Sequence, residues 1–275
     1  MDIATIIGLV AGLALVFFGM SGEGSLIPPS TFFDPEGIAV VLGGTLAATM
    51  INYPIKKVLK MFKVAAQAFS NRSNGTPLQI ISELAEYADL VRRKGLPALE
   101  NILPNVENHY LRMGLENAML ERDSRKLEIF LDNELDNMQD RHKDGQEIFY
   151  NMGTYAPAFG LLGTVMGLIL MMTEQGQTSS LDKYAAGAGD SMASLLSGMG
   201  MALVTTFYGV LLANLIFLPI AGKLKNRSAD EYFSLSIIKA GILSIHAKEH
   251  PLILQEKLLT FVDKSTRELH RQGSD

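Results

Sequence analysis

The sequence predicts an all-α polytopic membrane protein with four transmembrane helices and a helical cytoplasmic domain. Only 19% of its 275 residues are charged, whereas soluble domains average roughly 25%. Four stretches contain no Asp, Glu, Lys or Arg, namely residues 3–22, 37–55, 148–173 and 191–222. They are 20, 19, 26 and 32 residues long, and a helix needs about 20 apolar residues to cross a bilayer core. We therefore expect each stretch to span the membrane.

The first stretch is expected to remain in the protein as a transmembrane helix. The chain begins Met1-Asp2, without the basic residues that open a secretory signal peptide. The apolar part is also too long for such a signal, and no small-residue cleavage site follows it.

The basic residues predict the orientation of the chain. Residues 54–150 contain 14 Lys and Arg, and residues 223–275 contain nine. The connections 23–36 and 174–190 contain only Lys183. Because basic residues concentrate on the cytoplasmic side of membrane proteins, both long segments and both termini are expected in the cytoplasm.

This orientation divides the chain into four parts. They are residues 1–55 with the first two spans and a short outer loop, residues 56–147 as a cytoplasmic helical domain, residues 148–222 with the last two spans, and residues 223–275 as cytoplasmic C-terminal helices.

The cytoplasmic segment after the second span is expected to be helical. Apolar residues recur every three or four positions over residues 58–69, with lysines between them, which predicts an amphipathic helix continuing out of the membrane. Residues 70–75 have the composition of a turn. Further helical patterns cover residues 106–121 and 124–147, the second leading into the third span. No part shows the period-two alternation of a strand.

Two capping boxes and one proline predict further helix starts. Residues 76–79, Thr-Pro-Leu-Gln, predict a helix that ends near Lys94. Residues 228–231, Ser-Ala-Asp-Glu, predict a helix that ends near His246. Pro251 is expected to open a short final helix.

The sequence lacks the motifs of common catalytic and cofactor sites. It contains no cysteine, no phosphate-binding glycine loop, no nucleophile elbow and no HExxH zinc motif. His246 and His250 lie one helical turn apart, but no third ligand is evident, so a solvated helix end is favoured over a metal site. The net charge of -5 gives no basic field for nucleic acid. We expect neither an enzyme nor a bound cofactor or metal.

The predicted spans are rich in small and hydroxyl-bearing residues. Glycines at small-xxx-small spacing allow helix backbones to approach closely, which favours bundling or homo-oligomerisation in the lipid bilayer. Thr205 lies with Ser194 and Ser197 on one face of the fourth span. These hydroxyls fit either an aqueous path or hydrogen bonds to their own helix. No span interior carries an Asp, Glu, His, Lys or Arg, so a carboxylate for ion conduction must come from another chain.

Two membrane motifs resemble those of a known family. The first is residues 156–167, APAFGLLGTVMG, and the second is residues 201–209, MALVTTFYG, followed by residues 217–221, FLPIA. With the four-span layout, they resemble the flagellar motor stator A subunits (MotA/PomA) of the MotA/TolQ/ExbB proton channel family. The first residues, MDIATIIG, resemble the sodium-type branch.

The resemblance implies roles for individual residues. Arg92, Arg93 and Glu100 match charges that contact the rotor protein FliG in the family, and so does Glu134. The other matches are Pro157 and Pro219, which couple ion flow to movement, Thr164 and Thr206, which line the ion path, and Asp34, an acidic residue of the outer loop.

The resemblance also implies an assembly in the bacterial inner membrane. Five A subunits would surround a dimer of a B-type subunit (MotB/PomB), whose transmembrane Asp supplies the carboxylate. Flow of H⁺ or Na⁺ would then be converted into torque for flagellar rotation, motility and chemotaxis. Threonine oxygens are hard ligands that suit Na⁺, although proton-type members also carry them. The alternatives are an ExbB/TolQ-like energiser of an outer-membrane system and a non-conducting membrane scaffold.

Overall fold

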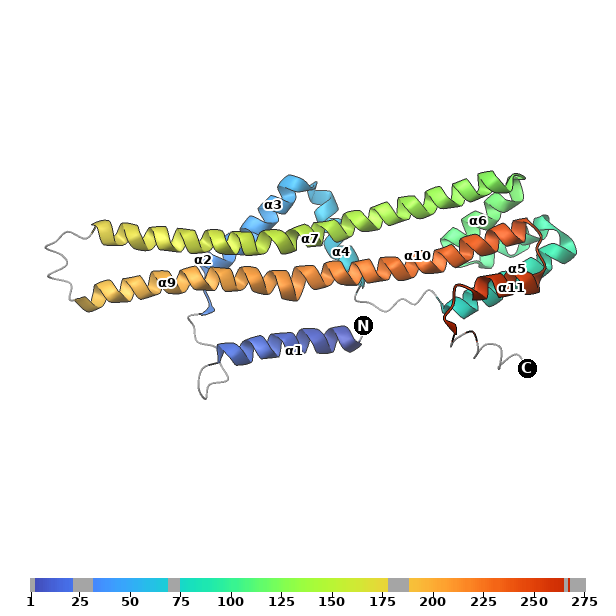
Figure 1. Cartoon of the computed structure of the whole chain (residues 1–275). Helices are drawn as coiled ribbons and strands as arrows, with labels where there is room; N and C mark the ends of the chain where they lie inside the picture. Colours follow the sequence, from blue (N-terminus) through green and yellow to red (C-terminus); the bar gives the residue numbers. More distant parts are fainter. Residues whose placement is uncertain (1–2, 22–31, 69–74, 178–187, 265–266, 268–275) are drawn as a thin grey trace. The chain divides into compact units, whose positions relative to one another are not determined.

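The computed structural model describes residues 3–21, 32–68, 75–177, 188–264 and 267 (Figure 1). These residues form α-helices, two π-helical segments and short 3₁₀ turns, and none of them is in a strand. The expected all-α class is thereby confirmed.

The chain folds into two compact units. The first unit comprises Met1–Asn71 and Lys143–Lys225, and the second comprises Arg72–His142 and Asn226–Asp275. Two long helices contribute to both units, α7 (Ser124–Gln177) and α10 (Leu218–His246). The same helices therefore take part in two different kinds of packing.

The first unit contains the predicted spans. Its remaining helices are α1 (Ile3–Met20), α2 (Pro35–Ile38), the π-helical η2 (Ala39–Gly43), α3 (Gly44–Asn52), α4 (Ile55–Ala68), α9 (Ala188–Leu211) and the π-helical η5 (Leu212–Phe217). Helical segments at Ser124–Thr173 and Gly198–His246 are long and apolar enough to cross a membrane. Pro35–Asn52 qualifies together with Ile55–Ala66, and Thr5–Met20 is a shorter apolar helix.

The second predicted span does not continue straight into the amphipathic helix. The chain bends by 117° between α3 and α4 (Figure 1). Pro54 disfavours a helical conformation of the residue before it, and Tyr53 has an extended backbone at φ -132°, ψ 142°. The expectation of a helix that continues out of the membrane was therefore wrong, because the turn at Pro54 redirects the chain.

The second unit is a bundle of shorter helices around an aliphatic core. Its additional elements are α5 (Pro77–Lys94), the 3₁₀ turns η3 (Leu96–Asn101) and η4 (Leu103–Asn105), α6 (His109–Leu120) and α11 (Pro251–Leu259). The core buries large side chains, including Leu84, Leu115, Leu131, Ile238 and Leu258.

Two of the predicted helix starts in this unit are confirmed. Thr76 accepts a hydrogen bond from the Gln79 amide, and Gln79 accepts one from the Thr76 amide, which completes the capping box of α5. Pro251 occupies the first turn of α11. The turn expected at residues 70–75 lies outside the described residues except for Gly75.

The capping box predicted at residues 228–231 does not start a helix. Helix α10 runs without a break from Leu218 to His246. The Ser228 side chain is buried and lies 3.1 Å from Nδ1 of His142 on α7. Because the preceding residues are already helical, the Ser228 hydroxyl pairs with a neighbouring helix instead of capping its own.

Candidate functional site

Helices α7 and α9 meet along a line of small residues, which we call the α7–α9 seam. It consists of Gly160, Gly163 and Gly167 on α7 and Ala202, Thr205, Thr206 and Gly209 on α9. A methyl group added at Gly209 would lie 2.6 Å from the Ala156 carbonyl oxygen, and one added at Gly160 would lie 3.0 Å from that of Thr205. The two backbones are therefore in direct contact, as small residues permit in membrane helices.

The three threonines of the predicted ion path lie in different environments. Thr205 is only 2% exposed, and its Oγ1 donates a hydrogen bond to the Ala202 carbonyl at 2.8 Å. Its side chain packs against Gly163 of α7 and Gly37 of α2. Thr205 is thus a packing residue at the junction of three helices.

Thr164 and Thr206 lie at the edge of the seam and remain half-buried. Thr164 Oγ1 donates to the Leu161 carbonyl at 2.6 Å, and Thr206 Oγ1 lies 3.5 Å from the Gly160 carbonyl. Gly160 and Thr164 are one helical turn apart, so the seam places both hydroxyls near the same stretch of α7. A hydroxyl that donates its hydrogen keeps its oxygen lone pairs free to accept or to bind a cation.

The two predicted coupling prolines are Pro157 on α7 and Pro219 on α10, and each lies at or next to a contact between α7 and the α9–α10 region. Pro157 faces Gly209 across the seam, where a methyl group on Gly209 would lie 3.1 Å from its Cα. Pro157 also leaves the Gly153 carbonyl without its usual helical donor. Gly153 packs against Leu218, which directly precedes Pro219. The structure therefore brings these two helix irregularities close together, although both helices continue through them.

The π-helical segments were missed by sequence reasoning. One of them, η5, ends at Phe217, two residues before Pro219. Proline has no amide hydrogen, so the regular hydrogen-bond ladder is interrupted there. Pro219 was the available signal for η5, whereas the residues of η2 include no proline.

Asp34 forms hydrogen bonds that hold the start of α2 in place. Its carboxylate caps α2 by accepting hydrogen bonds from the amides of Glu36 and Gly37 at 3.1 and 3.0 Å. Its own amide donates to the Tyr208 hydroxyl at 2.9 Å, and that hydroxyl donates to the Phe32 carbonyl. Tyr208 thereby ties the start of α2 to α9, a role that its sequence position did not indicate.

A reciprocal pair of hydrogen bonds holds the α3–α4 bend against α7. Asn52 donates to the Tyr155 hydroxyl at 3.1 Å, and Asn151 donates to the Tyr53 hydroxyl at 2.7 Å. Lys57 on α4 adds an ion pair with Asp144 at 2.6 Å. These polar residues were also missed, because partners about 100 positions apart in the chain carry no local pattern.

The predicted rotor-contact residues of α5 and η3 surround one tight turn. Gly95 adopts a φ of 82°, a left-handed conformation that glycine tolerates best, and Pro97 fits the first turn of η3. Arg93 pairs with Asp89 at 2.8 Å. Arg92 and Glu100 are exposed and form no hydrogen bond or ion pair within the part of the chain that the structure describes. Their charges are therefore available to a partner.

Glu134 lies on a different helix, α7, and is half-buried. It lies close enough to Tyr110 to influence its ionisation. Burial is the main cause that raises the pKa of the Tyr110 hydroxyl above its usual range, and the charges of Asp132 and Glu134 raise it further.

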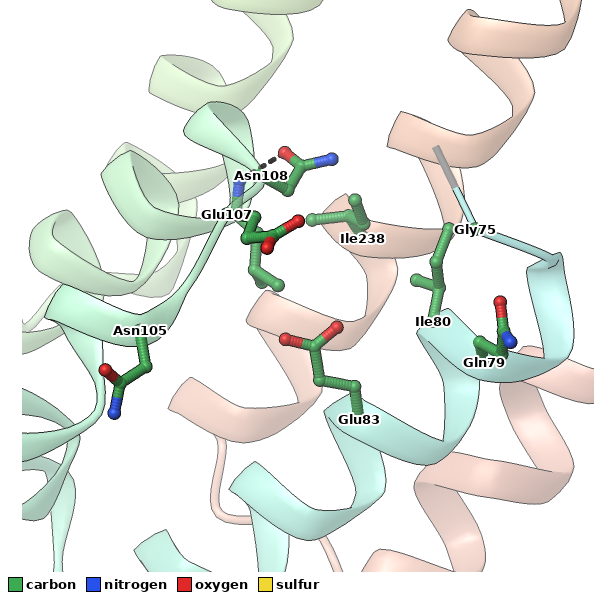
Figure 2. Close-up of a pocket in the computed structure, with 9 residues that line it drawn as sticks. Gly75, Gln79, Ile80, Glu83, Asn105, Glu107, Asn108 and Ile238 are labelled. Carbon is green, nitrogen blue, oxygen red and sulfur yellow. Dashed lines mark hydrogen bonds between the residues drawn. The ribbon is translucent and has the colours of Figure 1, made fainter. Parts of the chain in front are cut away.

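The second unit also contains a polar cavity of about 510 Å³. Figure 2 shows the carboxylates of Glu83 and Glu107 turned toward this cavity beside Ile238. Asn108 at its edge caps α6 by accepting a hydrogen bond from the Leu111 amide at 3.1 Å. No group of three metal-ligating side chains occurs among the described residues, here or elsewhere.

The histidine pair considered as a metal site has other partners. His246 lies 2.8 Å from the Glu121 carbonyl through Nε2. His250 caps α11, with Nδ1 accepting a hydrogen bond from the Leu252 amide. Both rings are therefore used at helix ends.

Comparison with known proteins identifies the family. Residues 103–236 match the MotA/TolQ/ExbB proton channel family. Motility protein A of Treponema phagedenis is 34% identical over 273 residues, which cover 99% of this chain and 98% of that protein. PomA of Vibrio alginolyticus is 28% identical over 269 residues, 98% of each chain.

A solved structure supports the same relationship. The flagellar MotAB stator complex from Bacillus subtilis contains a chain that superposes with a TM-score of 0.81 at 26% identity, covering 98% of both chains. Its fold and the full-length sequence similarity agree. The chain belongs to the family of flagellar stator A subunits, motility protein A and PomA, within the MotA/TolQ/ExbB proton channel family.

Proposed function

We propose that this protein is a stator subunit that forms an ion-conducting channel with a B-type partner and converts ion flow into torque on the flagellar rotor. The observation that carries the proposal is the α7–α9 seam. It holds two half-buried hydroxyls in spans that contain no carboxylate, and Pro157 faces Gly209 at one end of it. Such a wall is suited to line a path whose ionisable group belongs to another chain.

The proposed arrangement has four spans, at residues 3–22, 37–55, 148–173 and 191–222. The basic segments and both termini face the cytoplasm of the cell, and the protein lies in the inner membrane. The length and apolar character of α7 and of the α9–α10 region support this arrangement, as does the apolar helix α1. Five copies around a dimer of the B subunit would enclose the path, and no enzymatic reaction is involved.

Within the path we assign ion contact to Thr164 and Thr206, and packing to Thr205. The first two hydroxyl oxygens are accessible and retain free lone pairs, whereas Thr205 is enclosed by three helices. A partly dehydrated Na⁺, or a hydrated proton, would contact these oxygens as it passes to the carboxylate of the B subunit.

Thr206→Ala tests this assignment. Loss of one hard oxygen should raise the barrier for ion passage by about 1–3 kcal/mol, comparable to leaving a buried polar group unsatisfied. Swimming speed should fall sharply while expression and ring assembly persist. Thr173→Ala is the matched control, because the Thr173 hydroxyl also donates to a backbone carbonyl, that of Leu170 at 2.8 Å, but lies at the end of the third span.

Normal swimming of both Thr206→Ala and Thr164→Ala at low external cation would contradict the ion-path assignment. The coupling ion is then identified by measuring how the swimming speed of cells with the unmodified protein depends on external Na⁺ at fixed pH. A Na⁺-dependent speed indicates sodium coupling, and a speed that follows only the pH gradient indicates H⁺.

We further propose that Arg92 and Glu100 contact FliG. Both are exposed charges that flank the turn at Gly95, without partners among the described residues. Charge reversal by Arg92→Glu should reduce torque without loss of assembly, since exposed charges act mainly on encounter and register. A reversed charge on FliG that failed to restore torque would exclude direct electrostatic contact.

A further inference from the structure

Helix α4 presents three different stripes along its length. Val58 and Ala65 are buried, at 5% and 4% exposure, and Ala65 packs in one apolar cluster with Phe149 and Met152 of α7. A methyl group added at Gly145 of α7 would lie 2.5 Å from the Met61 sulfur. This first stripe attaches α4 firmly to the first unit.

The second stripe is apolar and exposed. Ile55, Leu59 and Phe62 are 57%, 65% and 40% exposed, and Ala66 is exposed as well. Their spacing of three and four residues places them on one face of the helix. A continuous apolar face of this kind is unusual in contact with water.

The third stripe is basic and lies beside the second. Lys56, Lys60 and Lys63 have the same spacing and are exposed. They form no hydrogen bond or ion pair with any residue that the structure describes, in contrast to Lys57, which pairs with Asp144. The sequence contains no Asp or Glu between Gly37 and Ser82. The charge of α4 itself is therefore exclusively positive.

The bend at Pro54 gives this helix a defined direction. Its axis turns by 117° from that of α3, so it runs 27° past a right angle. Transmembrane helices are tilted by about 20° on average, with a range of 0–40°. If α3 is a tilted span, α4 therefore runs close to the plane of the membrane surface instead of away from it.

We propose that the exposed face of α4 binds anionic phospholipids of the cytoplasmic leaflet. The apolar stripe inserts at the boundary of headgroups and acyl chains, and Lys56, Lys60 and Lys63 bind the phosphate-bearing headgroups. An apolar face flanked by lysines is the pattern of helices that lie in the membrane interface. The inference rests on the proposed membrane arrangement of α3, and it adds a specific lipid class as ligand.

The absence of cysteine from the sequence allows a direct test. The full-length Ala66→Cys variant, labelled with a fluorophore, is reconstituted in phosphatidylcholine vesicles that contain brominated phosphatidylcholine or brominated phosphatidylglycerol. We expect stronger quenching by the brominated phosphatidylglycerol. Each lysine should contribute about a fivefold preference, so replacing Lys56, Lys60 and Lys63 by Gln should reduce the preference by at least about tenfold. Lys126→Gln, an exposed lysine of the second unit, is the control and should change nothing.

Three results would overturn the proposal. Equal quenching by the two lipids would show apolar contact without headgroup recognition. No quenching by either lipid would show that α4 does not lie at the membrane. Loss of ring assembly in the triple Gln variant, with an unquenched label, would show that a neighbouring copy of the chain covers this face.

These failures differ from failure of the proposed function. The quenching measurement needs no ion gradient, and the Thr206 and Na⁺ experiments do not depend on the lipid at α4. Normal complementation of motility together with an unquenched label would reject the lipid site alone. A chain that did not enter vesicles at all would reject the membrane arrangement itself.

Discussion

The α7–α9 seam of the first unit and the core of the second unit use glycine in different ways. In the first unit, methyl groups added at Gly160 and Gly209 would meet backbone atoms of the facing helix, at 3.0 and 2.6 Å. In the second unit, methyl groups added at Gly114 and Gly241 would meet side-chain ends, Ile242 Cδ1 at 2.4 Å and Leu84 Cδ1 at 2.6 Å. At these two positions of the seam, backbone packs against backbone, whereas the glycines of the second unit leave space for large side chains.

The large apolar side chains show the same contrast. Leu161, Met172 and Leu203 of the first unit are 63%, 70% and 69% exposed, whereas Leu84 and Leu115 of the second are completely buried. Water drives large apolar side chains into a common core. Lipid offers no such drive, so membrane helices associate through close contact of small residues. Helices α7 and α10 take part in both kinds of packing, each along one continuous helix.

The largest expected effect is loss of a core side chain in the second unit. Leu84→Ala should destabilise this unit by about 2–5 kcal/mol, because it removes a fully buried side chain and leaves a cavity beside Gly241. Faster hydrogen exchange of α5 and α10 in the purified full-length protein measures it. Leu120→Ala, at a side chain that is 83% exposed, is the control. Equal exchange of both variants would contradict a core in this unit.

A smaller effect is expected from filling the α7–α9 seam. Gly209→Ala places a methyl group against backbone atoms that have little freedom to move, which should cost about 1–3 kcal/mol and reduce thermal stability and ring assembly. Gly200→Ala on the same helix has nothing within 4 Å of the new methyl group. It should be neutral or stabilising. Normal ring assembly and an unchanged melting temperature of Gly209→Ala would contradict direct backbone contact in the seam.

Gly114→Ala should cost less than Gly209→Ala, although its methyl group meets an atom at a shorter distance. The atom is the terminal Cδ1 of Ile242, which a rotation of the side chain can displace. The higher helix propensity of Ala, worth about 1 kcal/mol relative to Gly, offsets part of the strain. We expect a net change within about 1 kcal/mol, measured by hydrogen exchange of α6. A cost above that of Gly209→Ala would reverse the comparison between the units.

The smallest expected effect is a loss of stability of the second unit at alkaline pH, caused by the buried hydroxyl of Tyr110. Burial raises the folded-state pKa of Tyr110 above its unfolded value of about 10. The unfolded chain then ionises first as pH rises, so stability is complete below pH 10 and decreases above it. For this group the loss at pH 10.5 should be under about 1 kcal/mol. Hydrogen exchange between pH 9 and 11 should show a smaller decrease for Tyr110→Phe, and an unchanged decrease would contradict this origin.

The sequence alone determined the features that depend on local chemistry. Charge-free stretches identified the apolar helices, because membrane spans require length and composition. Thr76, Pro77 and Gln79 identified the start of α5, because the capping partners lie within four residues of one another. The same reasoning failed at Ser228, where the preceding helix and His142 on another helix outweighed the local pattern.

Only the tertiary structure decided how residues of equal chemistry are used. Thr205 and Thr206 are adjacent, and a helix rotates by about 100° per residue, so one is enclosed while the other stays accessible. Which of them is enclosed depends on where α7 and α2 pack. Likewise, Tyr208 and Phe32 are 176 positions apart and meet only because two helices pack together. Such contacts depend on packing of the whole unit, and no local residue pattern encodes them.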